Sequence, residues 1–269
     1  MPGRPRRVIV VAMDQLGDDL LLMAVNSDGT LVLPAKLRFG LAGSELVRLA
    51  AAGRVDIARG RIVIRAPAAT GDPLLDDALA SMSGGWREPT AKAWVKRARP
   101  GLVERYLAKA EAAGTIRADR RKALGFIPVT RWLVVDAARA AEARGRLEAA
   151  ASAAVLGQDQ AALAGLASAI DVTRFVFPGR AGAAARKRLR NAARREPAAA
   201  TVTAAVDGAA AAQHAAVDAA TRAATDAAVR AATDAAVSAA VDAATQAAVS
   251  AATDAAHDAG GHSAAGGHH

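Results

Sequence analysis

Histidine and cysteine most often carry nucleophilic, acid–base and metal chemistry, and residues 1–213 of this chain contain neither. The five histidines are His214, His257, His262, His268 and His269. The chain has no cysteine. Residues 1–213 therefore lack a Ser-His-Asp triad, a Cys-His pair and an ordinary zinc ligand set. We predict that the protein is not an enzyme and that it binds no metal or cofactor.

Two groups of neighbouring carboxylates are the remaining candidates for acid–base or Mg²⁺ chemistry. One is Asp18 with Asp19, and the other is Asp72 with Asp76 and Asp77. Asp72 stands directly before a proline, which is the order typical of a helix N-cap and first helical position. Carboxylates in a first helical turn are also stabilised by the helix dipole. We interpret both groups as helix beginnings rather than as a catalytic or metal site.

Arginine is abundant, and its distribution predicts an anionic partner. Residues 1–200 hold 33 Lys and Arg against 19 Asp and Glu, a net charge of +14. Residues 201–269 hold two Arg against seven Asp, a net charge of −5. A strongly basic body attracts either an anionic membrane surface or nucleic acid. Charge alone leaves both partners open.

The elements that must position these arginines are predicted to be mainly helical. Apolar spacing and capping residues predict helices over 14–25, 39–52, 72–83, 90–97, 101–113, 136–156 and 158–196, with a break in the last at 178–179. A short strand is predicted over 30–33 after a turn, and alternating residues predict a hairpin over 54–65. A further short strand is predicted at 115–116, and a second hairpin at 122–127 and 130–135 that turns near Pro128. We expect a helical bundle with peripheral helices and two or more β-hairpins.

The apolar stretches are too short for a membrane-spanning helix. The longest cover residues 8–13 and 20–25, whereas a spanning helix needs ~20 apolar residues. Arg4, Arg6 and Arg7 precede the first stretch in the manner of a secretory signal, but the stretch is short and runs into Asp14. We therefore expect a cytoplasmic protein.

The C-terminal part of the chain is of low complexity. From Ala215 to Asp258 the sequence repeats Ala-Ala-[Val/Thr/His]-X eleven times. A period of four does not match 3.6 residues per turn, so the larger side chains wind around a helix and leave no constant apolar face. We expect a solvated helical or disordered tail, with a coiled-coil arm as the alternative. The expected organisation is a basic arm at 1–13, a folded domain at 14–197 and the Ala-rich tail at 198–269.

Five segments in order resemble the Golgi-phosphoprotein-3-like family, including its bacterial members. They are Leu20-Leu-Leu-Met23, the stretch 41–55, Thr70-Gly-Asp-Pro-Leu-Leu-Asp-Asp-Ala-Leu79, the stretch 94–107 and the hairpin 126–133. The similarity covers residues 14–195 and leaves the tail outside. It implies a helical bundle with additional helices and hairpins. It also implies a peripheral membrane adaptor, because eukaryotic members bind phosphatidylinositol 4-phosphate.

The headgroup pocket of this family is altered in the present chain. In eukaryotic members a tryptophan and three arginines surround the phosphate. The corresponding positions here are Leu33, Ala42, Pro100 and Val103, so none of the four side chains is retained. Neighbouring arginines are the expected substitutes, because guanidinium groups match the geometry of a phosphate. We predict that an anionic, phosphoinositide-like headgroup is bound by Arg38, Arg97, Arg99 and Arg105.

The second hairpin is the candidate for a direct, reversible contact with the membrane. Its apolar residues are Phe126, Ile127, Pro128 and Trp132. We predict that they insert at the membrane surface, with packing into the core or between two copies of the chain as the alternatives. An adaptor also implies a protein cargo, which no sequence feature identifies.

Nucleic-acid binding is the alternative function. A helix over 101–113 followed by a hairpin resembles a winged helix, and a basic cluster follows at 186–195. Aromatic residues make up only 3% of the chain, and no platform for stacking single-stranded bases is recognisable. Membrane docking therefore remains the first hypothesis.

Overall fold

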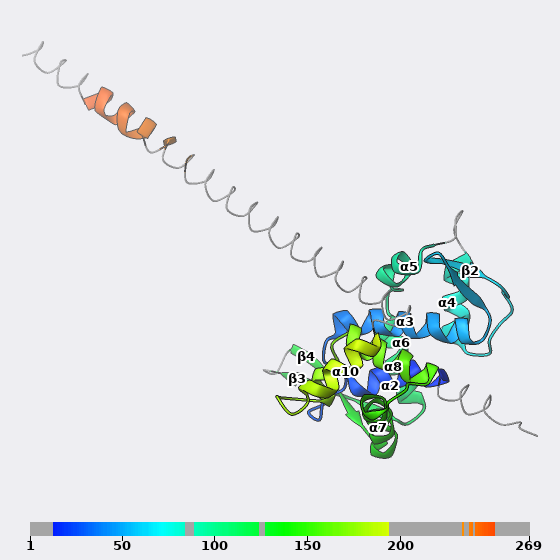
Figure 1. Cartoon of the computed structure of the whole chain (residues 1–269). Helices are drawn as coiled ribbons and strands as arrows, with labels where there is room; N and C mark the ends of the chain where they lie inside the picture. The colour runs from blue at the N-terminus through cyan, green and yellow to red at the C-terminus, as the bar shows by residue number, and fades with distance from the viewer. Residues whose placement is uncertain are drawn as a thin grey trace, which may run out of the picture. The chain divides into compact units, whose positions relative to one another are not determined.

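A computed structural model describes residues 13–83, 89–123 and 127–193, together with 233, 237, 238 and 240–250. The chain divides into two units, residues 1–210 and 211–269. Within the described part of the first unit, the expected mainly α fold with two antiparallel hairpins is confirmed (Figure 1).

The first unit follows a helix–hairpin–helix order that alternates twice. Its helices are α2 (Leu16–Met23), α3 (Pro34–Ala51), α4 (Pro73–Ser83), α5 (Ala91–Arg97), α6 (Leu102–Ala112), α7 (Ala137–Ser152), α8 (Gln158–Ala169), α9 (Thr173–Val176) and α10 (Ala183–Ala193). Its strands are β1 (Val55–Ala58), β2 (Arg61–Ile64), β3 (Ile116–Ala123) and β4 (Ile127–Val134).

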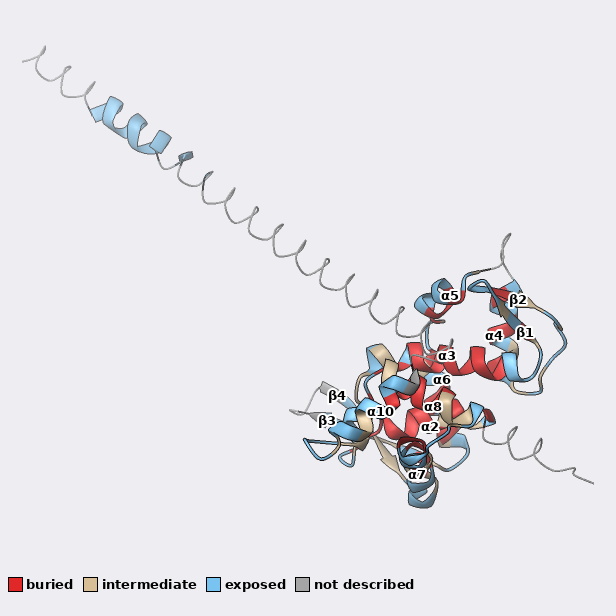
Figure 2. Ribbon diagram, in the orientation of Figure 1, coloured by how far each residue is buried: buried red, intermediate tan, exposed pale blue. Residues whose placement is uncertain are grey.

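Helix α2 lies at the centre of the hydrophobic core and contacts α3, α6, α7 and α8. Its leucine run is apolar on every side, which is the pattern of a helix surrounded by protein. Leu20 and Leu21 have no exposed surface. The buried residues of α2, α3 and α8 gather in the middle of this unit in Figure 2.

Helix α3 begins at Pro34, five residues before the predicted start, and the predicted strand over 30–33 is wrong. Leu31 makes only an isolated bridge with Val25. Proline fits the first turn of a helix because its φ is already helical, and because an N–H at that position would have no partner within the helix. Leu33, with a φ of 53°, turns the chain into α3.

The second hairpin turns earlier than predicted. Ala123 of β3 pairs with Ile127 of β4, and Lys122 of β3 pairs with Pro128. Pro128 therefore lies inside β4, and the expected turn near Pro128 is wrong. A proline is tolerated in a two-stranded hairpin, where each strand has one side without a hydrogen-bonding neighbour. The backbone N–H of Trp132 donates to the Gly29 carbonyl over 2.7 Å and fixes β4 on the core.

The predicted helix over 158–196 is divided into α8, α9 and α10. Asp171, with a φ of 64°, separates α8 from α9, and Pro178-Gly179 precedes α10 as expected. The expected boundary between 197 and 198 and most of the expected basic arm lie outside the described residues. Met13, the last residue of that arm, is buried in the core.

The second unit is helical and fully exposed where it is described. Residues 240–250 form a continuous helix, and each of them is exposed to solvent. Val241 and Val249 keep 58% and 61% of their surface exposed, as expected for a helix without a constant apolar face.

Candidate functional site

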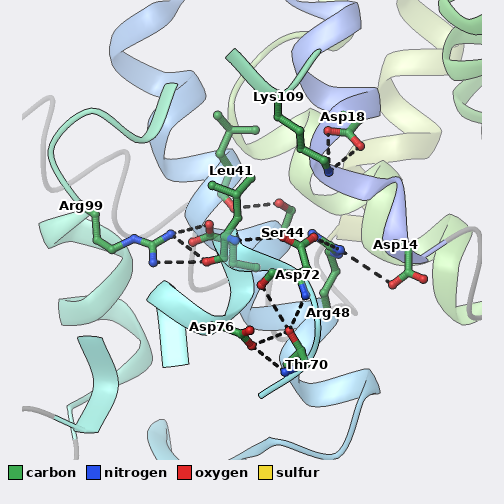
Figure 3. A network of polar contacts seen from close by, with 12 residues as sticks. Asp14, Asp18, Leu41, Ser44, Arg48, Thr70, Asp72, Asp76, Arg99 and Lys109 are labelled. Atoms are coloured by element: carbon green, nitrogen blue, oxygen red, sulfur yellow. Dashed lines mark hydrogen bonds and ion pairs between the residues drawn. The ribbon is translucent and has the colours of Figure 1, made fainter. Parts of the chain in front are cut away.

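Arg99 is the most enclosed of the four predicted headgroup arginines. It lies in the link between α5 and α6, and its side chain is 16% exposed. Its guanidinium donates to Glu45 of α3 over 2.5 Å and to the Leu74 carbonyl at the start of α4 over 3.2 Å (Figure 3). Arg99 therefore joins the α5–α6 link to two other helices.

Glu45 is a buried carboxyl with an unusual proton affinity. Its side chain has no exposed surface, and its Oε2 atom has no hydrogen-bond partner. Burial raises the pKa of Glu45 to about 8, although the charges of Arg99 and Arg48 oppose the rise. Burial of Tyr106 on α6 raises the pKa of its phenol, and the nearby charge of Glu45 raises this pKa further.

Arg48 forms the second buried cationic centre, one turn after Glu45 on α3. It donates to Asp72 over 2.7 Å and lies 3.8 Å from Asp14 (Figure 3). Burial works against ionisation of Asp72, but the hydrogen bond and charge of Arg48 outweigh it and lower the pKa of Asp72. Asp72 also accepts from the Leu74 N–H over 2.9 Å, which confirms its predicted role as the N-cap of α4.

The other predicted carboxylates are engaged by cations or by the backbone. Asp18 accepts from Lys109 over 3.0 Å, and Asp76 accepts from the backbone and hydroxyl of Thr70 (Figure 3). Asp19, 1% exposed, is held by Arg139 over 2.5 Å and Arg146 over 3.0 Å. Among the described residues no group of three or more His, Cys, Asp or Glu side chains is arranged to hold a metal ion.

The other three predicted arginines are exposed. Arg105 of α6 pairs with Asp77 of α4, with both side chains about half exposed. Arg97 lies in the last turn of α5, and no carboxylate of the described residues pairs with it. Arg38 of α3 stacks over the Phe39 ring, with its guanidinium carbon 4.5 Å from the ring centre.

Arg97, Arg99 and Arg105 are neighbours in the sequence and occupy the end of α5, the link and the first turns of α6. Arg38 comes from α3, seven residues before Glu45. Seven residues are almost two helical turns, so Arg38 lies on the same face of α3 as Glu45, about 10 Å along the axis. Arg38 belongs to a different helix, and no hydrogen bond or ion pair among the described residues links it to Arg97, Arg99 or Arg105.

The altered pocket positions are arranged around the same helices. Ala42 is buried on α3, one turn after Arg38, and Val103 is half-buried in the first turn of α6. Pro100 is exposed in the α5–α6 link, and Leu33 immediately precedes α3. Ala42 carries no charge, so Arg38, four residues earlier, is the nearest cation on that face of α3.

The β3–β4 hairpin carries a basic patch that the sequence analysis missed. Its members are exposed cations on both strands, namely Arg117, Arg120, Arg121, Lys122 and Arg131. Asp119 is the one acidic residue on the two strands, and it pairs with Arg121 over 2.7 Å. The sequence signal for this patch is the density of cations within the eight residues of β3.

The predicted apolar tip is divided by the structure. Phe126 lies outside the described residues, and Ile127 and Pro128 form the start of β4. Trp132 is half-buried and packs against the core at the base of the hairpin. Val129, 37% exposed and opposite Arg121, is an apolar side chain that β4 presents to solvent.

Helix α6 does not have the surface of a winged-helix recognition helix. Leu102, Tyr106, Leu107 and Ala110 face the core. Its exposed face holds Glu104 and alanines beside Arg105, whose charge is paired with Asp77. A recognition helix needs a basic or polar face toward the phosphates, so the order of helix and hairpin alone does not support this interpretation.

These features define a mainly helical protein with two hairpins, a basic surface and paired carboxylates. Residues 16–209 match the model of the Golgi phosphoprotein 3 (GPP34) family, and because this match covers most of the chain, the chain belongs to that family. The family resemblance seen in the sequence is thereby confirmed. The family is known in general for phosphatidylinositol 4-phosphate-binding adaptors rather than enzymes. No curated protein matches the chain.

None of the described helices is both long enough and apolar enough to span a membrane.

Proposed function

We propose that this chain is a non-catalytic peripheral membrane protein that docks reversibly, from the cytoplasm, on anionic phospholipid surfaces. Membership of the GPP34 family supports the adaptor class. The observation that carries the proposal is the β3–β4 hairpin, whose five exposed cations flank the apolar sequence Leu124-Gly-Phe-Ile127.

The hairpin combines the two features that favour a membrane surface. A Lys or Arg side chain near an anionic leaflet contributes about 1 kcal/mol, and apolar side chains beside it add to the affinity when they enter the interface. Arg120 and Lys122 lie on the same face of the hairpin as Trp132, but farther along it toward the turn. They are therefore placed to contact headgroups while Trp132 anchors the base.

Arg38, Arg97 and Arg105 are the proposed ligands of an individual headgroup phosphate. Their guanidinium groups are exposed, and only Arg105 is paired with a carboxylate of the described residues. A phosphate competes with Asp77 for Arg105 through stronger, doubly hydrogen-bonded contacts. Arg99 acts as a positioning residue, because it holds the link between α5, which carries Arg97, and α6, which carries Arg105.

Co-sedimentation of the full chain with lipid vesicles tests the proposal. The panel contains phosphatidylcholine alone, and mixtures with phosphatidylserine, phosphatidylglycerol or phosphatidylinositol 4-phosphate at equal total charge. We expect binding to all anionic mixtures, weakening as salt shortens the Debye length from ~10 Å at 0.1 M to ~3 Å at 1 M. Equal sedimentation with neutral and anionic vesicles would overturn the proposal.

A matched pair of variants separates the hairpin from general charge. Arg120→Ala with Lys122→Ala removes two charges from the hairpin and should weaken vesicle binding about 10- to 30-fold. Lys92→Ala with Arg144→Ala removes two exposed charges from α5 and α7 and should weaken it far less. Equal losses in the two variants would show that the hairpin has no special role.

A further inference from the structure

The segment that contains α9 and α10 is the most one-sidedly charged part of the chain. Between Asp171 and Glu196 the sequence has eight Lys and Arg residues and no Asp or Glu. The described residues 172–193 hold six of these cations. The membrane-docking function proposed above makes no use of this segment.

Buried packing fixes the segment on the body, and a hydrogen-bonded turn orders it internally. Leu189 has no exposed surface and anchors α10, which packs on α7 and α8. Arg186 donates to the carbonyls of Phe177 and Gly179, the latter over 3.0 Å, and so closes the turn before α10. Arg186 and Leu189 therefore have structural roles, and they hold the remaining cations in place.

Arg188 is exposed but donates to the Ala151 carbonyl of α7 over 3.5 Å, so four further exposed cations of the described segment remain. They are Arg174, Arg180, Lys187 and Arg190. No carboxylate within residues 13–83, 89–123 or 127–193 forms an ion pair with any of them. Lys187 and Arg190 are three residues apart, which places them side by side on the outer face of α10. Arg174 stacks over Phe175, 4.9 Å from its ring centre, and Phe175 is itself 37% exposed.

The chemistry of this face favours a phosphodiester backbone over a lipid surface. A helix that lies in a membrane interface presents large apolar side chains on one face and cations on the other. The single large apolar residue of α10, Leu189, faces the core, so the exposed side offers charge and alanine without an inserting face. Duplex nucleic acid needs no insertion, because its phosphates carry one charge per ~1.7 Å of axis.

We propose that the α9–α10 segment is a second anion-binding surface, which binds the phosphate backbone of duplex nucleic acid without sequence preference. Arg174, Arg180, Lys187 and Arg190 neutralise phosphates, and Arg186 positions them. The affinity is electrostatic, so it depends steeply on salt through release of counterions.

Fluorescence anisotropy of the full chain with a labelled, random-sequence DNA duplex tests this surface. The measured quantity is the slope of the logarithm of affinity against the logarithm of salt concentration. The variant Arg174→Ala, Arg180→Ala, Lys187→Ala, Arg190→Ala should have a slope shallower by about 3 to 4, because each lost phosphate contact removes ~0.9. Lys92→Ala with Arg144→Ala is the control away from the segment, and its slope should change by less than about 1.

Three outcomes overturn the proposal. The first is a four-residue variant that keeps the parent's slope, and the second is a parent that binds no duplex. The third is a variant that binds duplex normally but loses anionic vesicles, which would assign the surface to lipid. Circular dichroism confirms that the variant is folded. The hairpin variant Arg120→Ala, Lys122→Ala should keep most of its affinity for duplex DNA while it loses vesicle binding. Failure of the duplex proposal and failure of the membrane proposal are therefore distinguishable.

Discussion

Arg99 donates to Glu45 over 2.5 Å although the Glu45 side chain has no exposed surface. This pair joins the α5–α6 link to the middle of α3, and the second contact of Arg99, with the Leu74 carbonyl, adds the start of α4. Together with the Arg48–Asp72 pair, these contacts fix the α5–α6 link, α3 and the start of α4 in relative position. The exposed Arg97 and Arg105 project from a support that this one guanidinium holds.

Replacing Arg99 should destabilise the body far more than replacing its exposed neighbour. Arg99→Ala removes charge-assisted hydrogen bonds to a buried carboxyl and a carbonyl, and we expect a loss of about 2–3 kcal/mol in the free energy of unfolding. Arg97→Ala, at an exposed helix end, should change it by no more than about 0.5 kcal/mol. Urea unfolding followed by circular dichroism measures both. Similar losses for the two variants would show that the buried contacts of Arg99 contribute little.

The pH dependence of stability should carry the signature of Glu45. Its pKa is about 8 in the folded protein, above the ordinary value of 4.5, so the folded state keeps a proton that the unfolded state has released. Stability contributed by this group is therefore fully present below pH 4.5 and is lost as the pH rises toward 8. The slope between these values is at most about 1.4 kcal/mol per pH unit.

The variant Glu45→Gln isolates this contribution. Glutamine imitates the protonated carboxyl, so the stability difference between parent and variant should shift in favour of the variant as the pH rises from 5 to 8. Glu104→Gln, at an exposed position on α6, controls for loss of one carboxyl. Urea unfolding across this pH range provides the test, and parallel curves for parent and Glu45→Gln would contradict the prediction.

Two glycines in helices should respond to alanine in opposite directions. A Cβ at Gly17 of α2 would lie 2.5 Å from Tyr106 Cε1 and 2.7 Å from its hydroxyl oxygen, whereas a Cβ at Gly145 of α7 would meet nothing within 4 Å. Gly17→Ala should cost about 1–3 kcal/mol through overpacking. Gly145→Ala should stabilise the protein by about 0.5–1 kcal/mol, because alanine favours the helix. Thermal melts of both variants measure the contrast, and equal effects would refute it.

The sequence predicts most helices because their signals are local. Asp72 with Pro73 begins α4, and the positive φ of Gly53 ends α3 as expected of a C′ glycine. The errors occur where a local sequence pattern is compatible with two different structures. Residues 30–33 are apolar and β-branched enough for a strand, but Pro34 starts a helix directly after them and only Leu31 forms an isolated bridge, with Val25. Pro128 looks like a turn residue, but the pairing of Lys122 with Pro128 places the turn before it.

The candidate site is less predictable, because burial and pairing are not local properties. Arg97, Arg99 and Arg105 look alike in the sequence, yet only Arg99 meets Glu45, 54 residues earlier in the chain. The same limit applies to Arg186, which closes a turn, and Lys187, which faces solvent. Sequence spacing alone gave no means of separating structural arginines from available ones.

Removing Arg38 and Arg97 together should weaken binding to vesicles that carry phosphatidylinositol 4-phosphate. Both side chains are exposed, and neither forms an ion pair with a described carboxylate. We expect a loss of about tenfold, larger than for phosphatidylserine vesicles of equal charge, because guanidinium groups favour phosphate geometry. Sedimentation with both vesicle types measures the difference. Equal losses would indicate general electrostatics rather than a headgroup site.

Ending the chain at Ala210 should leave the first unit folded. The described helix of the second unit, residues 240–250, is exposed throughout, and its valines bury less than half of their surface. Burial that small contributes little of the ~25 cal/mol per Å² that stabilises packing. Thermal melts of residues 1–210 and of the full chain should agree within about 2 °C. A large fall in the melting temperature of the shorter chain would contradict the prediction.

The two-stranded construction of the β3–β4 hairpin has a further consequence for solubility. Each strand has one outer edge whose N–H and C=O groups pair with no other strand among the described residues, and such edges are templates for aggregation. Rows of Arg and Lys discourage a second chain from adding there, because like charges would be brought together. The cations of this hairpin therefore also act as gatekeepers. Variants that neutralise all of them should precipitate at concentrations at which the parent remains dispersed.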